Sequence, residues 1–297
     1  MAKFQWLHQK TEHGPLSQLW DSFRQQHAAV VGLMLFGFFS LIALFGPLLT
    51  PYDPYLQNPD ALLLPPSWDD LGDVRYLLGT DDLGRDQLSR LIKGASYTFG
   101  IALVTAIGAL LFGLLLGVLA GMSKGFRASA FNHVLDLALT IPSLLLAIII
   151  VAILGPGLVN TIWAIMLALL PQFVHGIRNT ILQQLEQEYV IAYRLDGANN
   201  WQILRYVILP NTWEQLTVLF SMALSTAILD IAALGFLGLG AQAPAAEWGL
   251  MVADALDLIY LSPWSIALPG LLIFIAVLSV NLVSDGLRTA VRKRQEN

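Results

Sequence analysis

Residues 188–210 have the sequence EYVIAYRLDGANNWQILRYVILP, a polar, helix-prone island between two long apolar segments. Gly197 interrupts the island, and a glycine after a helical run commonly ends the helix in a left-handed conformation. Asn199 can cap a second helix that begins near Trp201. We therefore expect two short helices joined at Gly197, with Pro210 closing the second, on the face of a membrane. From spacing alone, an ordinary amphipathic loop helix is an equally good interpretation.

The composition is that of an integral membrane protein. The chain has 297 residues, of which 56% are hydrophobic and 12% are charged, whereas soluble domains carry about 25% charged residues. The mean hydropathy is +0.64. The chain contains no cysteine, which excludes a disulfide framework, a thiol nucleophile and a cysteine-ligated metal. The formal net charge is −5, and no basic cluster is large enough to predict nucleic-acid binding.

Apolar segments predict six membrane-spanning helices in an all-α fold. Residues 28–49 form 22 positions without a charge, which as a helix extend about 33 Å and can cross a hydrocarbon core of about 30 Å. Pro142 is expected to kink the third span, and the fourth is expected to end near Pro171. The predicted spans are residues 28–49, 97–122, 134–154, 158–174, 215–240 and 264–283.

Three glycines in the second predicted span are spaced four residues apart, at Gly113, Gly117 and Gly121. This spacing places them on one face of a helix, where another helix can approach closely. Glycine is also simply common in membrane helices, and for any single glycine that is the simpler interpretation.

The distribution of charge predicts that both termini lie in the cytoplasm. In that orientation 12 of the 16 lysine and arginine residues fall on the cytoplasmic side. This satisfies the positive-inside rule. The four basic residues left outside are Arg75, Arg85, Arg90 and Lys93. The predicted organisation is a cytoplasmic segment 1–27, a first helix 28–49, an external loop 50–95, a five-helix core 96–286 that includes the loop 186–210, and a cytoplasmic basic tail 287–297.

The external loop contains the sequence LGTDDLGRD at residues 78–86, followed by Ser89-Arg90. Taken by itself, this pattern predicts a folded extramembrane turn held by Asp–Arg pairs. The residues of the motif that we single out are Gly79, Thr80, Asp81, Gly84, Arg85 and Asp86.

Asp230 lies deep within the fifth predicted span. An ionisable group at this depth usually faces the bundle interior or a water-filled cavity. Asp230 can therefore belong to a substrate pathway, or it can be a structural hydrogen-bond partner between helices, and both interpretations stay open. The chain has no Gly-x4-Gly-Lys-Ser/Thr phosphate loop and no histidine–carboxylate cluster at metal spacing. We therefore expect no ATP site and no metal site, and no catalytic cluster stands out.

The polar island resembles the EAA loop of ABC transporter permeases, in which Glu-Ala-Ala, three residues, Gly, nine residues and Ile-x-Leu-Pro follow one another. Gly197, the spacing and the Leu209-Pro210 pair agree with this motif. Ile191 replaces the glutamate of the family, and Tyr193 replaces its second alanine. The LGTDDLGRD stretch resembles a motif that dipeptide and oligopeptide permeases carry between their first two spans. The resemblance covers nearly all of the chain and, within this group, is closest to the Sap type.

This resemblance implies a six-helix permease of the bacterial inner membrane with a type I ABC importer-like fold. It implies a second homologous permease subunit, two ATP-binding subunits that hold ATP and Mg²⁺, a periplasmic substrate-binding protein and membrane lipid as partners. The chain itself would be non-catalytic and hold no cofactor. Implied substrates are peptides, including antimicrobial peptides, or a polyamine such as putrescine. The residues expected to couple the chain to the ATPase are Glu188, Ala192, Arg194, Asp196, Gly197, Ala198, Leu209 and Pro210.

The resemblance does not transfer a role to Asp230. Related permeases place an acid one position later, where this chain has Ile231, and one residue rotates a side chain by about 100° around a helix. The competing hypothesis is a six-span channel or secondary transporter without an ATPase. Ion coupling predicts charged residues in several spans, whereas only Asp230 lies deep in one. The residues leave the substrate and the direction of transport open.

Overall fold

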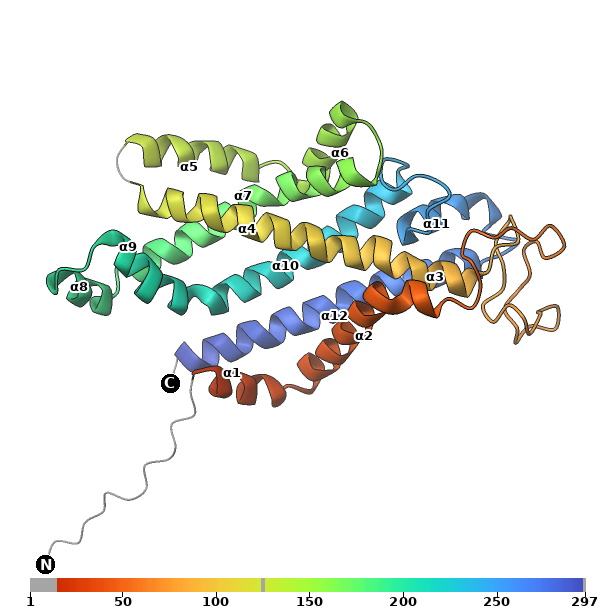
Figure 1. The fold of residues 1–297 in the computed structure, drawn as a ribbon, viewed down its shortest axis with the longest axis horizontal. Coiled ribbons are helices and arrows are strands. Elements are labelled where there is room, and N and C mark those ends of the chain that lie inside the picture. The colour runs from red at the N-terminus through yellow and green to blue at the C-terminus, as the bar shows by residue number, and fades with distance from the viewer. Residues whose placement is uncertain (1–14, 124–125, 296–297) are drawn as a thin grey trace, which may run out of the picture.

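The computed structural model describes residues 15–123 and 126–295, and the regular elements within them are helices (Figure 1). Five helical stretches are long and apolar enough to cross a membrane, and a bent pair makes a sixth candidate. The elements are α1 Pro15–Arg24, α2 His27–Leu49, α3 Gln87–Ala95, η1 Ser96–Gly100, α4 Ile101–Met122, α5 Phe126–Leu139, α6 Ser143–Leu154, α7 Leu158–Leu185, α8 Glu188–Leu195, α9 Asn200–Ile203, η2 Leu204–Ile208, α10 Leu209–Phe236, α11 Trp248–Asp254, η3 Leu256–Leu258 and α12 Trp264–Gln295.

The glycine stripe of α4 packs against α7. A Cβ atom built on Gly113 would lie 2.4 Å from the Cβ atom of Phe173, and one on Gly117 would lie 2.8 Å from Ile177. Gly121 faces the next turn of α7 in the same way. The missing side chains therefore let the two helix backbones approach closely, and the sequence-based prediction for this stripe is confirmed.

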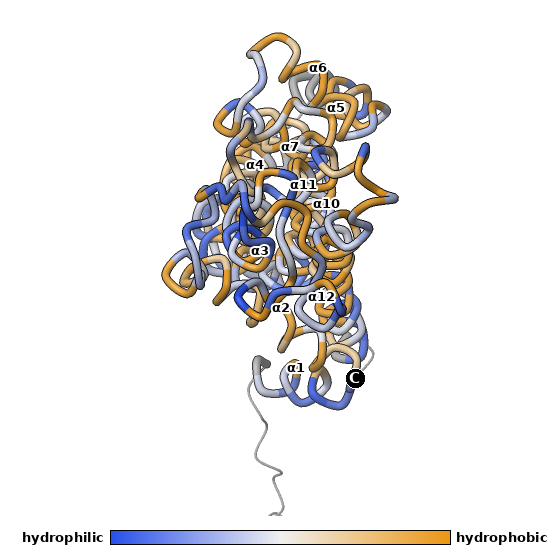
Figure 2. Tube along the Cα trace, turned by 90° about the vertical axis from the view of Figure 1, so that its right-hand side faces the viewer, coloured by the Kyte–Doolittle hydropathy of each residue, from blue (hydrophilic) through white to orange (hydrophobic). Residues whose placement is uncertain are grey.

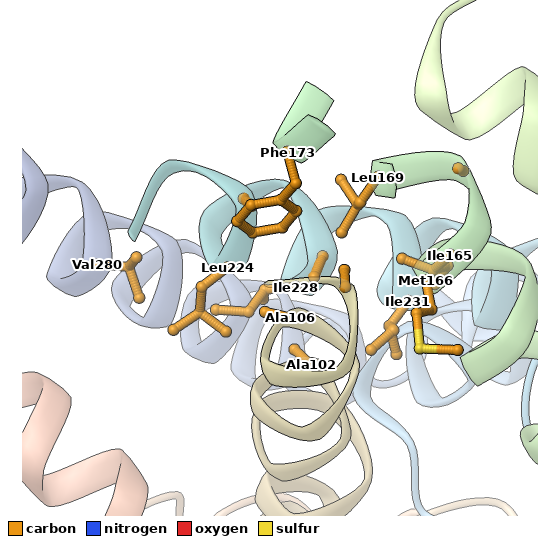
Figure 3. Packing of buried hydrophobic residues seen from close by; sticks show 14 of the residues in the cluster. Ala102, Ala106, Ile165, Met166, Leu169, Phe173, Leu224, Ile228, Ile231 and Val280 are labelled. Carbon is orange, nitrogen blue, oxygen red and sulfur yellow. The ribbon is translucent and has the colours of Figure 1, made fainter. Parts of the chain in front are cut away.

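The main apolar core lies where α4, α7, α10 and α12 meet (Figure 3). Small alanines on α4 leave room for bulky side chains from the other helices, which is how interiors reach crystal-like density. Much of the chain is hydrophobic along its length (Figure 2). Many large hydrophobic residues are exposed, as expected for surfaces that face lipid. The labelled core residues are Ala102, Ala106, Ile165, Met166, Leu169, Phe173, Leu224, Ile228, Ile231 and Val280.

The external loop is shorter than the loop predicted from its polar sequence, because the helix of the second span begins at Gln87 and runs to Met122. Asp86 caps this helix by accepting a 2.8 Å hydrogen bond from the Ser89 backbone N–H. The polar side chains of Gln87, Ser89 and Arg90 are buried against protein. The expectation of a loop through residue 95 was wrong, since polar residues that contact protein can continue a helix.

The third predicted span consists of two helical segments that meet at a sharp bend. The segments His133–Leu139 and Ser143–Leu154 meet at an angle of 95°. Pro142 was expected to produce a kink, and the observed break is much sharper. The fourth span does not end near Pro171 as expected, because α7 continues to Leu185 with this proline inside it. Proline is tolerated within membrane helices where neighbouring groups satisfy the freed backbone.

Pro210 does not close a short helix, as had been expected. The helical stretch Asn200–Phe236 is continuous, and Pro210 occupies the first turn of α10 directly after the π-helical turn η2. Proline is tolerated inside such a helix where a local π-helical adjustment satisfies the backbone groups that it frees. The last span likewise extends as α12 to Gln295, so most of the predicted basic tail is helical.

The two ends of the bundle differ in what they carry. The helices α1, α8 and α9 and the C-terminal end of α12 lie at one end (Figure 1). The loop before α3, together with α6 and α11, lies at the other. Three basic residues of the orientation count, Lys3, Lys10 and Lys124, lie outside the described part of the chain, as do the side chains of Arg127 and Arg294.

Candidate functional site

The end of α8 forms a left-handed glycine turn. Gly197 has φ +86°, and its N–H donates to the carbonyl of Arg194 at 3.1 Å. The Ala198 N–H donates to the carbonyl of Tyr193 at 3.0 Å. These two bonds are those of a Schellman motif, which satisfies the last carbonyls of a helix. The helix stop predicted at Gly197 is confirmed.

A capping box starts the following helix at Asn199. The Asn199 side chain accepts a hydrogen bond from the Gln202 N–H at 2.9 Å, and the Gln202 side chain accepts one from the Asn199 N–H at 2.8 Å. Both ends of the α8–α9 corner are therefore fixed by local hydrogen bonds. The predicted pair of helices joined at Gly197 is present.

The corner is anchored to the bundle by a few apolar residues. Val190 of α8 is fully buried, as are Ile203 and Ile208 in the stretch that follows. The Tyr189 hydroxyl donates to the Gln184 side chain on α7, and partial burial raises the pKa of Tyr189. These contacts attach the α8–α9 corner to the end of α7.

Large apolar side chains point outward from this corner. Leu195 is 84% exposed and Tyr206 is 67% exposed. Exposed aliphatic and aromatic residues gathered on one segment are typical of protein or membrane interaction sites. We call residues 191–206 the docking tip. Its large exposed apolar residues are Ile191, Tyr193, Leu195, Trp201 and Tyr206.

The docking tip is hollowed at the glycine turn. The volume of the hollow is about 410 Å³. A Cβ atom on Gly197 would meet no atom within 4 Å, so the turn is open to a partner. The hollow is lined by Tyr193, Asp196, Gly197, Ala198, Gln202 and Tyr206.

The structure brings together only part of the predicted coupling set. Asp196, Gly197 and Ala198 line the hollow, whereas Leu209 and Pro210 lie on the first turn of α10 and do not. The three predicted residues on α8 are exposed, namely Glu188, Ala192 and Arg194. Sequence reasoning missed the tyrosines of the hollow. The signal that could have found them is the presence of aromatic residues in an otherwise polar stretch.

The external motif forms a buried ion-pair cluster at the opposite end. One Asp81 carboxylate oxygen accepts from the Arg85 and Leu83 N–H groups at 2.9 and 3.0 Å. The other lies 2.7 Å from Arg85 Nε and 3.3 Å from Arg90 Nε. Arg90 is 2% exposed. The predicted Asp–Arg pairs are therefore present, and they hold the loop onto the start of α3.

The other motif residues shape the loop backbone. Gly79 and Gly84 have φ +78° and +70°, and a Cβ atom on either would lie within 2.2 Å of a backbone carbonyl oxygen. Thr80 is fully buried, and its hydroxyl accepts from the Leu64 N–H at 2.9 Å. With Asp86 as the cap of α3, the six motif residues all have structural roles in folding this loop.

Glu247 fastens α11 into the bundle and was not among the predicted site residues. One carboxylate oxygen accepts from the Gly249 N–H at 3.0 Å and from the Thr98 hydroxyl at 2.7 Å. The other accepts from the Leu250 N–H at 2.8 Å. Burial raises the pKa of Glu247, and the three hydrogen bonds oppose that rise. The adjacent Trp248 is fully buried, so α11 is packed into this end of the bundle.

A small cleft lies between the ion-pair cluster and α11. Its lining includes Asp81, Arg85 and Arg90 on one side and Asp254 on the other. Burial raises the pKa of Asp254, and the two arginines lower it in part. The cleft is therefore a mixed-charge contact between the loop and α11.

Asp230 is buried within the chain rather than open to solvent, with 5% of its surface exposed. The Ser143 side chain hydrogen-bonds its carboxylate, and Ser143 is the first residue of α6, at the sharp break of the bent pair. The second carboxylate oxygen has no partner among the described residues. This geometry fits a hydrogen bond between helices, and a role in the pathway stays a prediction.

These features define a class: an all-helical, multi-pass membrane protein with the type I ABC importer permease fold and an exposed helical corner between two of its spans. Residues 113–297 match the family described as "Binding-protein-dependent transport system inner membrane component". Residues 14–66 match the "N-terminal TM domain of oligopeptide transport permease C". The chain belongs to the first of these families and is a multi-pass protein of the bacterial inner membrane.

Similar proteins are of comparable length. The chain is 49% identical to the peptide transport system permease protein SapC of Escherichia coli O6:H1, over 95% of this chain and 96% of that protein. It is 46% identical to the di/tripeptide transport system permease protein DppC of Pseudomonas aeruginosa, over 95% and 93%. An inward-facing structure of the MetNI methionine ABC transporter contains a chain with a similar fold, at a TM-score of 0.54 and 19% identity, covering 67% of this chain and 96% of that one.

Proposed function

We propose that this chain is the non-catalytic transmembrane subunit of an ATP-driven importer of short peptides. The family membership supports the transport role, and the relatives named for peptide and di/tripeptide transport support the substrate class. Antimicrobial peptides and putrescine are narrower substrates that the resemblance implies. They are separate predictions within this proposal.

The main support for coupling to an ATPase is the structure of the docking tip. A corner with an open hollow and exposed residues such as Leu195, Trp201 and Tyr206 is suited to insert into a groove of another protein. Two ATPase subunits would bind ATP and Mg²⁺, close on each other and push on this tip. Because α7 and α10 flank the tip in the chain, its movement would pass directly into two membrane spans.

Charge supports a cytoplasmic position for the docking tip. The basic residues described toward its end of the bundle are Arg24, Arg178, Arg194, Arg205, Arg288, Arg292 and Lys293. The opposite end carries Arg75, Arg85, Arg90 and Lys93. The positive-inside rule therefore supports a cytoplasmic position for the tip and for both termini. The loop before α3 would then face a periplasmic substrate-binding protein, and a second homologous permease would complete the translocation path.

Affinity purification from native membranes in mild detergent, followed by mass spectrometry, tests this function. We expect a second permease and two ATPase subunits to co-purify. Proteoliposomes of that complex, with a binding protein, should take up labelled di- and tripeptides only when ATP and Mg²⁺ are present. A homo-oligomer without an ATPase, in several detergents and with ATP added, would instead favour a channel or secondary transporter.

A further inference from the structure

An apolar groove runs between α1, α2, α10 and α12. Its volume of about 410 Å³ falls within the range of small-molecule pockets, about 300–1,000 Å³. Its lining is almost wholly hydrophobic and comes from one short terminal helix and three membrane-spanning helices. The residues used below are Trp20, Phe23, Leu33, Thr217 and Leu287.

The helix α1 forms one wall of this groove and is fixed in place. Phe23 is buried with residues of α2 and α12. Gln26 donates a side-chain hydrogen bond to the Gly286 carbonyl at 3.2 Å. A Cβ atom on Gly286 would lie 2.3 Å from the Ala29 Cβ, so α12 and α2 touch closely here. Trp20 nevertheless stays 49% exposed, so this wall is preformed and accessible.

An arginine of α1 lies beside the groove. The Arg24 guanidinium carbon lies 6.0 Å from the ring centroid of Trp20, on the α1 wall. Arg288 of α12 follows the lining residue Leu287, but its guanidinium nitrogen lies 3.0 Å from the sulfur of Met222, which does not line the groove. Both arginines are exposed, and Arg292 and Lys293 follow one turn later on α12. The nearby acids are Asp21 and Asp285, which leaves the rim basic.

From the apolar lining and the basic rim we infer that the groove binds an anionic phospholipid. The acyl chains occupy the space between Phe23, Leu33 and Thr217, and the phosphate lies near Arg24, beside Trp20. Basic pockets between membrane helices on the cytoplasmic side bind anionic head groups. Tryptophan is enriched at membrane–water interfaces, so Trp20 supports a position of the groove at such an interface. The bound lipid contacts both α1 and α10, and α10 is the helix that follows the docking tip in the chain.

Native mass spectrometry of the full chain with its co-purifying subunits tests this site. The probes are phosphatidylglycerol and phosphatidylcholine with matched acyl chains, added to the delipidated complex. We expect the complex to bind phosphatidylglycerol more tightly. Arg24→Gln should weaken that lipid by about five-fold and leave phosphatidylcholine unchanged. Leu33→Trp, which fills the groove, should displace both lipids.

Matched controls separate the groove from general charge and hydrophobicity. Arg75→Gln removes an arginine from the opposite end, and Leu41→Trp enlarges a residue on α2 that is 60% exposed and outside the groove lining. Neither control should change lipid binding. Equal binding of the two lipids, or unchanged phosphatidylglycerol binding in Arg24→Gln, would overturn the site. Unchanged lipid binding in Leu33→Trp would overturn it too, because the lipid would then lie outside the groove.

Discussion

The two ends of the molecule are built on opposite principles. At the docking tip, local hydrogen bonds shape the backbone and large apolar side chains such as Leu195 and Tyr206 face outward. At the other end, charged groups such as Asp81, Arg90 and Glu247 are buried and paired within the protein, and Glu247 bonds to Thr98, 149 residues away in the chain. Changes at the tip should therefore impair partner binding while leaving the fold intact. Changes at the opposite end should unfold the chain before they affect coupling.

Gly197→Arg should give the largest functional effect, a loss of ATP-driven uptake to background. The new side chain would project from the open turn into the ATPase contact, since a Cβ atom there meets no atom of this chain. Peptide uptake in proteoliposomes and ATPase co-purification measure the effect. Gly238→Arg is the matched control, because Gly238 also has a positive φ, +70°, and open surroundings. Normal uptake by a well-folded Gly197→Arg variant would show that the tip does not couple this chain to the ATPase.

Asp81→Asn should give the largest loss of stability, about 3–5 kcal/mol, because it leaves Arg85 and Arg90 without their shared carboxylate. Thermal unfolding in detergent measures this loss. The control is Asp73→Asn. Asp73 pairs with Arg75 on the surface, and that arginine lowers the pKa of Asp73. Exposed pairs of this kind contribute little, so equal effects of the two variants would show that the Asp81 cluster is not structural.

The accuracy of the sequence-based prediction follows the range of the interactions involved. The turn at Gly197 and the cap at Asn199 depend on residues within five positions, and both were predicted correctly. Pro171 and Pro210 were wrongly expected to end helices, because the consequence of a proline depends on the groups packed around it. The buried role of Glu247 could not be predicted, since its partner Thr98 lies 149 residues away in the chain.

Glu247→Gln should cost about 1–3 kcal/mol of stability, because the amide nitrogen cannot accept the bond that the Leu250 N–H now donates. The loss is smaller than at Asp81 because the remaining oxygen can still accept from Gly249 and Thr98. The unfolding temperature in detergent measures it. Glu188→Gln at the exposed start of α8 is the matched substitution and should leave that temperature unchanged. An equal fall in both variants would contradict the contrast between the two ends.

Leu195→Ser should have the smallest effect on the fold, within about 0.5 kcal/mol, because its side chain is 84% exposed and contributes little to the core. It should still weaken ATPase binding, since burying a leucine side chain at an interface is worth about 1.5–3 kcal/mol. Leu71→Ser is the closest control, at 79% exposure on the opposite end. A titration of ATPase subunits onto the purified permease should separate the two variants. If both bind alike, exposed apolar surface alone does not mark the docking tip, and the hollow beside Gly197 must supply the contact.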